Sequence, residues 1–285
     1  MRIRALHQSI KKNLESCYPK EEAAAITDLL FADLLGFSRS YIITHADENL
    51  SESSLALMEE KTRLLLAFTP IQHIIGQAPF LNLHFYVNED VLIPRPETEQ
   101  MIHIAEDLLA KHSFSKILDI GTGSGCIPIA LQKRNPTLAV TSIDVSAKAL
   151  EVAEKNNALN KTNVVLKQMD FLDEVQWNDL PIFDLILSNP PYIPIAEKEL
   201  LDKNVSLHEP HLALFVPNEN PLLFYKKIAA FSESHLNKDG FIVLETHEKL
   251  AHQTAEMIRL HTNLCTEVQK DIFGKDRFVI ATRCR

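Results

Sequence analysis

The sequence predicts an α/β protein in which a small helical domain precedes a mostly parallel β-sheet covered by helices on both faces. Three observations predict this fold class. Apolar residues follow helical spacing in the first quarter of the chain, and after residue 116 short apolar runs alternate with helical stretches. The last two apolar runs lie too close together for a crossover helix. The length of 285 residues is enough for two domains with separate cores.

Residues 1–78 are predicted to form the helical domain. Apolar residues recur at every third or fourth position over residues 3–14. A second helix is expected to begin after Pro19 and to end at Gly36, because glycine readily adopts the left-handed conformation that ends many helices. A third helix is expected from Ser51 to a point before the next proline.

Residues 79–95 are expected to form a β-hairpin that links the two domains. Apolar residues alternate in the first half of this segment, and Val91 and Leu92 follow an Asn-Glu-Asp turn. The second domain is then expected over residues 96–285. It begins with a helix that reaches about Lys111 and has a proline in its first turn.

Five strands of the second domain are separated mostly by helical stretches, which predicts parallel pairing. The last two apolar runs are expected to pair antiparallel. An otherwise parallel sheet with an antiparallel last strand is the Rossmann-like arrangement of the class I methyltransferases. The expected strands lie at residues 117–120, 139–143, 164–167, 183–187, 241–245, 264–268 and 277–282.

The composition narrows the class of protein. The net charge is −9, whereas a protein that holds a nucleic-acid backbone usually presents a basic surface. The four cysteines lie far apart without a Cys-x-x-Cys pair, so neither a disulfide framework nor a zinc site is expected. The twelve histidines form no metalloprotease pattern, so we expect no metal. The sequence has no apolar signal region and no apolar run of about 18 residues, which favours a cytoplasmic protein without a membrane span.

A glycine-rich loop follows the first expected strand of the second domain. Three of the seven glycines in the chain fall at positions 121, 123 and 125, between a buried apolar run and a helical stretch. Glycine lets the backbone approach a ligand closely, and free N–H groups at a helix start favour an anionic group. Position 126 is Cys, where a dinucleotide fingerprint has glycine, so the spacing favours S-adenosylmethionine. The expected cofactor contacts of the loop are Gly121, Thr122, Gly123, Ser124 and Gly125.

Acidic residues end the next two strands. Asp144 is placed to accept hydrogen bonds from ribose hydroxyls, and the alternative is a tight turn with an unrelated surface aspartate. Asp170 and Phe171 are expected beside the adenine, where the carboxylate accepts from the exocyclic amine and the ring flanks the base. A strand-end aspartate and a core phenylalanine explain this second pair nearly as well.

The segment Asn189-Pro190-Pro191-Tyr192 follows the fourth expected strand, on the same edge of the sheet as the glycine loop. The two prolines stiffen the turn and hold Asn189 extended. The –NH2 group of an amide or a base is a poor nucleophile. The Asn189 side-chain oxygen and the Pro190 carbonyl can orient such a group and stabilise the charge that develops as it attacks a sulfonium methyl. We therefore expect Asn189, Pro190 and Tyr192 to be catalytic and, with Pro191, to bind the substrate; the alternative is a rigid turn with a capping asparagine.

Together these motifs resemble the HemK/PrmC family, the glutamine N(5)-methyltransferases that modify peptide-chain release factors. Further segments match the family in the expected order and extend the resemblance over most of the chain. They are Pro70-Ile71-Gln72-His73-Ile74-Ile75-Gly76, Val91-Leu92-Ile93-Pro94-Arg95-Pro96-Glu97-Thr98-Glu99, Glu209-Pro210 with Ala213-Leu214, Leu222-Leu223-Phe224-Tyr225, and Asp271-Ile272-Phe273-Gly274-Lys275-Asp276-Arg277.

The resemblance implies a helical N-terminal domain that recognises the protein substrate and a Rossmann-like catalytic domain. The implied methyl acceptor is the glutamine of a Gly-Gly-Gln loop on class I release factors. S-Adenosylmethionine is the implied donor and S-adenosylhomocysteine the product, with no nucleic acid or membrane as partner. Carried over by position, the cofactor contacts are Gly121 through Gly125, Asp144, Phe171 and Asn189, and the glutamine contacts are Asn189, Pro190, Pro191 and Tyr192.

The sequence departs from the family pattern in two loops. The family usually has a glycine soon after the acid that ends the fifth strand, whereas Thr246-His247 follows Glu245 here, and residues 215–220 lack an expected glycine. Three other functions stay open. Methylation of a ribosomal-protein glutamine uses the same chemistry, a DNA adenine N(6)-methyltransferase uses a similar turn but needs a basic cleft, and a non-catalytic binding module could keep the fold.

Overall fold

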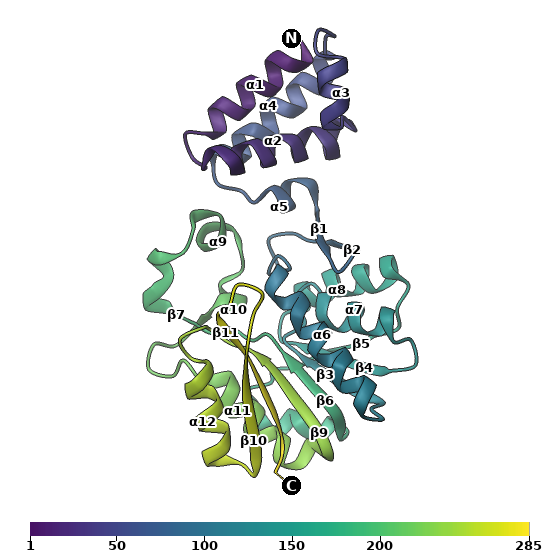
Figure 1. The fold of residues 1–285 in the computed structure, drawn as a ribbon, viewed down its shortest axis with the longest axis vertical. Helices are drawn as coiled ribbons and strands as arrows, with labels where there is room; N and C mark the ends of the chain where they lie inside the picture. The colour runs from purple at the N-terminus through teal and green to yellow at the C-terminus, as the bar shows by residue number, and fades with distance from the viewer. Residues whose placement is uncertain (285) are drawn as a thin grey trace. The chain divides into compact units, whose positions relative to one another are not determined.

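The structure is a computed structural model in which residues 1–284 are described. The chain divides into two compact units, Met1–Gln77 with Leu201–His208, and Ala78–Leu200 with Glu209–Arg285. Figure 1 shows the helices of the first unit and the twisted sheet of the second. Across residues 1–284 we find no helix with the length and apolar character that crossing a bilayer requires.

The first unit consists of helices around an apolar core. Gly36 ends α2 in the left-handed conformation, and the Ser51 hydroxyl caps α4 by accepting a hydrogen bond from the Ser54 N–H, both at the predicted helix ends. α3 and α5 were not predicted because they are too short to show a periodic pattern. α1 buries Ile3, Leu6, Ile10 and Leu14. The helices are α1 (Ile3–Leu14), α2 (Lys20–Leu35), α3 (Arg39–Thr44), α4 (Glu52–Leu66), α5 (Ile71–Ile75) and α9 (Lys203–His208).

α9 joins this unit although the chain reaches it only after most of the sheet. The His208 side chain forms a hydrogen bond with the Ala67 carbonyl at 3.0 Å, and the Lys203 ammonium lies 4.8 Å from the centre of the Phe68 ring. The predicted boundary at residue 96 places this segment in the second domain, so α9 departs from the prediction. Its short helical run carries no sign of the packing, because the partners are more than 130 residues away in the chain.

The hairpin differs from the prediction. β1 (Gln77–Phe80) pairs with β2 (Leu83–Tyr86) around a turn at Leu81 and Asn82, both of which have positive φ. Such a two-residue turn matches the right-handed twist of paired strands. Val91 and Leu92, the expected return strand, lie in no strand. Val91 is apolar because it packs, with Ile93, against α8 (Ala147–Asn160).

The second unit contains a seven-stranded sheet with the order β10-β11-β9-β6-β3-β4-β5. The neighbouring strands β9, β6, β3, β4 and β5 pair in parallel. β11 runs antiparallel to both β9 and β10. This confirms the predicted fold class. The strands are β3 (Lys116–Ile120), β4 (Ala139–Asp144), β5 (Val165–Gln168), β6 (Phe183–Ser188), β9 (Leu236–Glu245), β10 (Leu264–Lys270) and β11 (Asp276–Arg283), and the two-residue strands β7 (Ile193–Pro194) and β8 (Phe215–Val216) pair separately.

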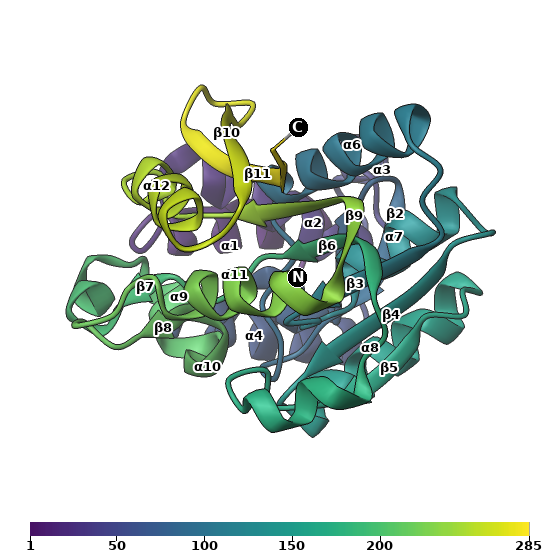
Figure 2. The ribbon, with the colours of Figure 1, turned by 90° about the horizontal axis from the view of Figure 1, so that it is seen from below.

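Helices cover both faces of this sheet, as Figure 2 shows in an end-on view. Successive side chains of a strand point to opposite faces. Leu185 and Leu187 of β6 therefore pack in the core that contains α6 and α7, whereas Ile186 packs in the core that contains α11 and α12. The helices of this unit are α6 (Pro96–Lys111), α7 (Cys126–Arg134), α8, η1 (Glu174–Asp179), η2 (Ile195–Leu200), α10 (His211–Leu214), α11 (Leu223–His235) and α12 (Ala251–His261).

The strand register brings three predicted site segments to one edge. Ile120 at the end of β3 is paired with Ile143 of β4 on one side and with Ser188 of β6 on the other. The residues at or directly after these strand ends, including Asp144 and Asn189, thus lie at the same edge of the sheet. The chain crosses to opposite sides of β3 here, and ligands of parallel sheets bind at such a point.

The cysteine prediction needs one correction. Cys265 and Cys284 form a disulfide, with Cα atoms 5.1 Å apart. The sequence separation of 19 hid the pairing, because only the antiparallel register of β10 and β11 brings the start of one strand beside the end of the other. Cys17 and Cys126 are free thiols.

Candidate active site

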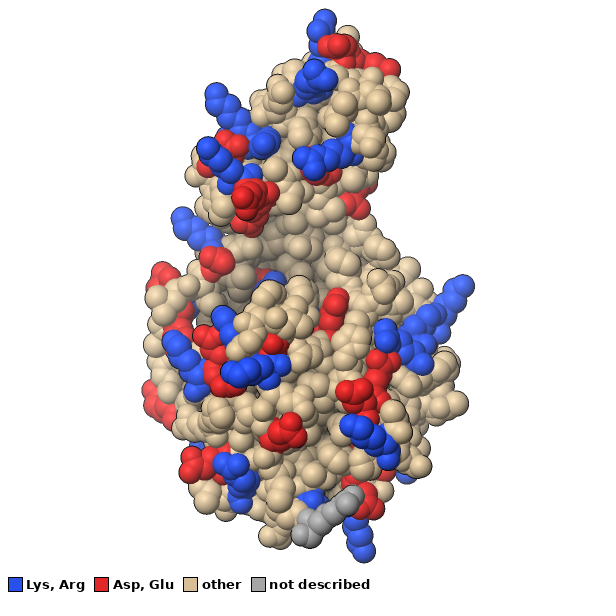
Figure 3. Space-filling model, in the orientation of Figure 1, with Lys and Arg blue, Asp and Glu red and all other residues tan. Residues whose placement is uncertain are grey.

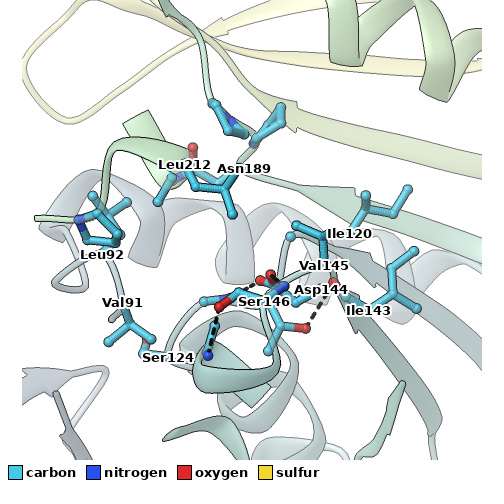
Figure 4. A pocket seen from close by; sticks show the side chains of 18 of the residues that line it. Val91, Leu92, Ile120, Ser124, Ile143, Asp144, Val145, Ser146, Asn189 and Leu212 are labelled. Carbon is cyan, nitrogen blue, oxygen red and sulfur yellow. Dashed lines mark hydrogen bonds between the residues drawn. The ribbon is translucent and has the colours of Figure 1, made fainter. Parts of the chain in front are cut away.

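A cavity of about 280 Å³ opens at the carboxyl edge of the sheet, close to the smallest volumes of small-molecule pockets, about 300 Å³. Figure 4 shows Asn189 and Leu212 on one side of it and Asp144 with Ser146 on another. Ten of the predicted site residues line the cavity, and two, Gly125 and Tyr192, do not. The ten are Gly121, Thr122, Gly123, Ser124, Asp144, Asp170, Phe171, Asn189, Pro190 and Pro191.

The glycine loop has the backbone that the sequence predicts. Gly121, Gly123 and Gly125 have φ of +82°, +53° and +80°, values that side chains rarely tolerate. A Cβ added at Gly121 or Gly123 would meet no atom within 4 Å. The backbone therefore borders open space at these two positions, as contact with a ligand requires.

Gly125 has a different environment. A Cβ there would lie 2.8 Å from Ile129 Cδ1 and 3.3 Å from Ala153 Cβ. Gly125 is also the residue before α7, whose first turn it shapes with its left-handed conformation. This glycine therefore allows α7 to pack against α8 and does not itself line the cavity.

Gly125→Ala is expected to lower the free energy of unfolding by about 2–5 kcal/mol, because left-handed backbone costs about 1–2 kcal/mol and overpacking about 1–3 kcal/mol. The measurement is urea denaturation followed by circular dichroism. Gly274→Ala is the matched control, since Gly274 has φ of +79° and no atom within 4 Å of an added Cβ. Equal losses in the two variants would contradict the packing role.

Asp144 holds the glycine loop while it faces the cavity. Its Oδ2 accepts a hydrogen bond from the Gly123 N–H and its Oδ1 accepts one from the Ser146 N–H, each at 2.9 Å. Burial raises the pKa of this carboxyl, and the backbone hydrogen bonds oppose the increase. Each oxygen retains a lone pair, so the carboxylate can still accept from a hydroxyl group in the cavity.

A second carboxyl, Asp119, lies beneath the loop at the end of β3. Ser142 donates to its Oδ2 at 2.5 Å, and the Thr122 hydroxyl makes a short hydrogen bond with the same serine. Burial raises the pKa of Asp119 to about 7. Asp119 does not line the cavity, so it supports Thr122 from below.

The sequence left two interpretations of Asp170 and Phe171 open: contacts to adenine, or a strand-end aspartate with a core phenylalanine. The structure fits the first for Asp170 and mainly the second for Phe171. Asp170 is exposed at the cavity, and its Oδ1 accepts from the Leu172 N–H at 2.9 Å, which leaves Oδ2 for a ligand. Phe171 also borders the cavity but is buried, with its ring centre 5.4 Å from those of Trp177 and Phe231. The phenylalanine is thus a core residue with one side toward the cavity.

Asn189 is held by a side chain from another element. Its Nδ2 donates to the Thr98 hydroxyl of α6 at 3.3 Å, and Thr98 donates to Glu245 Oε2 at the end of β9 at 2.8 Å. Thr98 and Glu245 are both 2% exposed. Thr98 also lines the cavity, although no pattern in the sequence assigns it a role there.

Tyr192 lies behind the turn. Its ring packs against the apolar core, and its centre is 6.1 Å from that of His247 in an edge-to-face arrangement. Burial raises the pKa of its phenol, and the nearby carboxyl of Glu245 adds to this increase. In this structure the ring therefore supports the Asn-Pro-Pro turn instead of bordering the cavity.

An ion pair with a buried carboxylate, which sequence reasoning missed, holds the segment that carries Pro210 and Leu212. Arg95 Nη2 donates to Glu209 Oε1 at 2.5 Å, and the Ile93 N–H donates to the other carboxylate oxygen at 3.2 Å. The Glu209 side chain is 1% exposed. Both residues belong to matched family segments, but 114 residues separate them, so no local pattern pairs them.

The two departures from the family pattern have a simple local explanation. Among the described residues, neither Thr246-His247 nor the segment 215–220 contains a residue with positive φ. Thr246 is instead held by β11, since its N–H donates to the Arg277 carbonyl at 2.8 Å. Glycine is therefore not required by the backbone at either loop.

Family models match both units. The model described as PrmC N-terminal domain matches residues 5–76, and the model described as Methyltransferase small domain matches residues 102–205. Relatives named release factor glutamine methyltransferase are 37% identical in Flavobacterium psychrophilum, over 98% of both chains, and 38% identical in Bacteroides thetaiotaomicron, over 96% of this chain and 98% of the relative.

Solved structures support the fold alone. The hMettl16 catalytic domain in complex with the MAT2A 3′UTR hairpin 6 aligns with a TM-score of 0.55 at 20% identity, over 83% of this chain and 84% of that one. SMU.776, in complex with SAH, aligns with a TM-score of 0.50 at 14% identity, over 73% of this chain and 56% of that one.

The sheet topology and the cavity beside the glycine loop define a class I methyltransferase, an enzyme whose methyl donor is S-adenosylmethionine. The motif order had indicated one family of such enzymes, and the relatives match it over nearly the whole chain. The chain belongs to the release factor glutamine methyltransferase family.

Proposed function

We propose that the protein transfers a methyl group to the side-chain amide nitrogen of the glutamine in the Gly-Gly-Gln loop of class I peptide chain release factors. The observation that carries the proposal is the carboxamide of Asn189 on the cavity wall. Its Nδ2 is engaged by Thr98, so its Oδ1 is the atom left to accept a hydrogen bond from a ligand. An acceptor fixed at this point suits an incoming –NH2 group.

S-Adenosylmethionine supplies an electrophilic methyl group on a sulfonium when it is bound. The open backbone at Gly121 and Gly123 fits the approach of such a donor, because a Cβ added at either glycine would meet no atom within 4 Å. We propose that Asp144 accepts from its ribose hydroxyls, and that Asp170 and Phe171 flank the adenine. Thr122, Ser124 and Asn189 are proposed to complete the cofactor contacts, while Gly125 contributes through the packing of the loop.

The acceptor side relies on the Asn-Pro-Pro-Tyr turn. We propose that Asn189 Oδ1 and the Pro190 carbonyl accept the two hydrogens of the glutamine –NH2 group, which directs the nitrogen lone pair toward the methyl carbon. Pro191 is proposed to contact the glutamine side chain, and Tyr192 to stiffen the turn beneath it. A general base is not needed before transfer, because the N-methylated cation is acidic and loses its proton afterwards.

The proposed partner is the release factor itself, recognised by the helical first unit. The family membership supports this partner, and the proposed reaction belongs in the cytoplasm, where translation ends. A DNA adenine methyltransferase would need a basic cleft. On the face drawn in Figure 3, acidic and basic side chains are interspersed over the sheet unit, which favours a protein substrate.

The test is methylation with labelled donor followed by mapping of the label. Purified protein is incubated with a class I release factor, with ribosomal proteins and with duplex DNA in separate reactions. We expect label on the release factor at the Gly-Gly-Gln glutamine, located by mass spectrometry of the proteolysed product. A release factor with alanine in place of that glutamine is the control. Label on a ribosomal-protein glutamine or on adenine would replace the proposal with one of those alternatives.

A further inference from the structure

A hydrogen-bonded chain of three side chains runs from the cavity wall into the protein interior. It starts at Asn189, passes through the Thr98 hydroxyl, and ends at the carboxyl of Glu245. The three residues come from three elements: the turn after β6, the first turn of α6, and the end of β9. Thr98 and Glu245 are buried, so water does not compete for these hydrogen bonds.

We propose that Thr98 and Glu245 are positioning residues that determine which side of the Asn189 carboxamide faces the cavity. This inference rests on the proposed function for the role of Asn189 Oδ1, and it adds the residues that keep that atom in place. Neither residue is required to touch the donor or the glutamine.

The number of available protons determines which group donates in each hydrogen bond of the Asn189–Thr98–Glu245 chain. An ionised carboxylate only accepts hydrogen bonds, and a threonine hydroxyl has a single proton. When Glu245 is ionised, the Thr98 hydroxyl donates its proton to Oε2 in a hydrogen bond. It can then only accept a hydrogen bond from Asn189. Asn189 must then present Nδ2 to Thr98, which turns Oδ1 the other way.

A protonated Glu245 removes this constraint. The carboxylic acid can donate to the Thr98 hydroxyl, which is then free to donate to Asn189 Oδ1. The carboxamide can turn over and present –NH2 to the cavity, where it repels the –NH2 group of the substrate. A single proton on Glu245 therefore exchanges donor and acceptor in both hydrogen bonds that link Glu245, Thr98 and Asn189.

Several charged or titratable groups surround Glu245. Burial raises the pKa of Glu245 to about 7, and the Thr98 hydrogen bond and the positive charge of Arg277 oppose that increase. The surrounding groups come from every element packed against it: Arg95 and Glu97 at the start of α6, Cys126 of α7, Tyr192 after β6, Tyr225 of α11 and Arg277 of β11. The ionised form that orients Asn189 is thus present above about pH 7, so turnover should increase with pH through this value.

The test compares Thr98→Val, which removes the hydroxyl at constant shape, with Thr98→Ser, which keeps it. We measure kcat from pH 5.5 to 9 at saturating S-adenosylmethionine, with the release factor as substrate. Thr98→Val should lower kcat by about tenfold at high pH, leave donor affinity within about twofold, and lose the pH-dependent increase. Thr98→Ser should recover both turnover and the increase.

Glu245→Gln is the second variant, because it removes the titration and keeps a hydrogen-bonding group of the same size. Its kcat should be independent of pH near 7. Thr254→Val is the control, since Thr254 is a fully buried threonine of α12 whose hydroxyl has no hydrogen-bond partner among the described residues. A pH-dependent increase that persists in Thr98→Val and Glu245→Gln would overturn the proposal, as would equal loss of turnover and donor affinity.

A readout without substrate separates this inference from the proposed function. The side-chain NH2 signal of Asn189, assigned by its loss in Asn189→Ala, should shift with pH near 7 in the wild type and in Thr98→Ser but not in Thr98→Val. A signal that does not titrate in the wild type would overturn the proposal that Thr98 and Glu245 orient Asn189. A titrating signal in an enzyme that does not methylate release factors would overturn the proposed function but would still support the positioning role of Thr98 and Glu245.

Discussion

Asn189→Ala is expected to lower kcat by about a hundredfold or more, the typical cost of removing one preorganised polar group from a reaction site. The variant removes Oδ1, the acceptor left facing the cavity once Thr98 has engaged Nδ2. The two prolines remain, so the turn keeps its shape while the incoming nitrogen loses an acceptor. Donor affinity, measured by calorimetry, should change by no more than about threefold, since one contact among many is lost.

The matched control is Asn178→Ala, which removes an exposed carboxamide on η1 whose hydrogen-bond partner within residues 1–284 is the Val175 carbonyl. It should leave kcat and donor affinity unchanged. An equal loss of kcat and donor affinity in Asn189→Ala would mean that Asn189 mainly holds the donor. Unchanged kcat would remove the asparagine from the transfer step altogether.

The elements that the sequence predicted well are those with a repeating local cause. Buried parallel strands are continuous apolar runs, and all seven strands of the large sheet lie within a few residues of their expected positions. Helix ends with a glycine or a serine cap, such as Gly36 and Ser51, were also predicted closely. Each of these signals lies within a few residues of the structure that it produces.

The errors share an opposite cause. Leu81 and Asn82 form a turn that has no glycine signal, and Val91 appears as a strand residue although α8 is what buries it. The Cys265–Cys284 pair depends on strand register, which no spacing reveals. In each case a partner distant in the chain, or a turn of unusual composition, determines the structure.

The residues of the candidate site show the same difference between local signals and distant contacts. Gly121, Asp144 and Asn189 could be selected because each lies at or directly after the end of a strand, and strand ends of a parallel sheet share one edge. Thr98 and Glu245 could not be selected, since 147 residues separate them and a buried threonine near a helix start has an ordinary explanation as a cap. Position along the chain predicts which residues border a ligand, but the contacts that orient them require the folded structure.

Asp144→Ala is expected to weaken S-adenosylmethionine binding by about tenfold to a hundredfold, because hydrogen bonds to a charged group contribute about 1.5–3 kcal/mol. Two losses combine. The proposed ribose contact disappears, and the Gly123 and Ser146 N–H groups lose their acceptors, so the glycine loop becomes less well ordered. The measurement is isothermal calorimetry with S-adenosylmethionine and with S-adenosylhomocysteine.

Asp144→Asn separates the two losses. The asparagine keeps one oxygen to accept from one backbone N–H but presents an –NH2 group to the other, so donor affinity should fall between those of the wild type and Asp144→Ala. Asp179→Ala, which removes an exposed carboxyl outside the cavity, is the control and should bind the donor normally.

The charge of Asp144 adds a dependence on pH to this prediction. Burial raises the pKa of the carboxyl, so it protonates at a higher pH than an exposed aspartate. Ribose hydroxyls favour the ionised acceptor, and therefore donor affinity in the wild type should weaken as the pH is lowered toward that pKa. In Asp144→Ala this weakening should be absent. An affinity for the donor that is the same in Asp144→Ala and the wild type at neutral pH would exclude Asp144 from ribose binding.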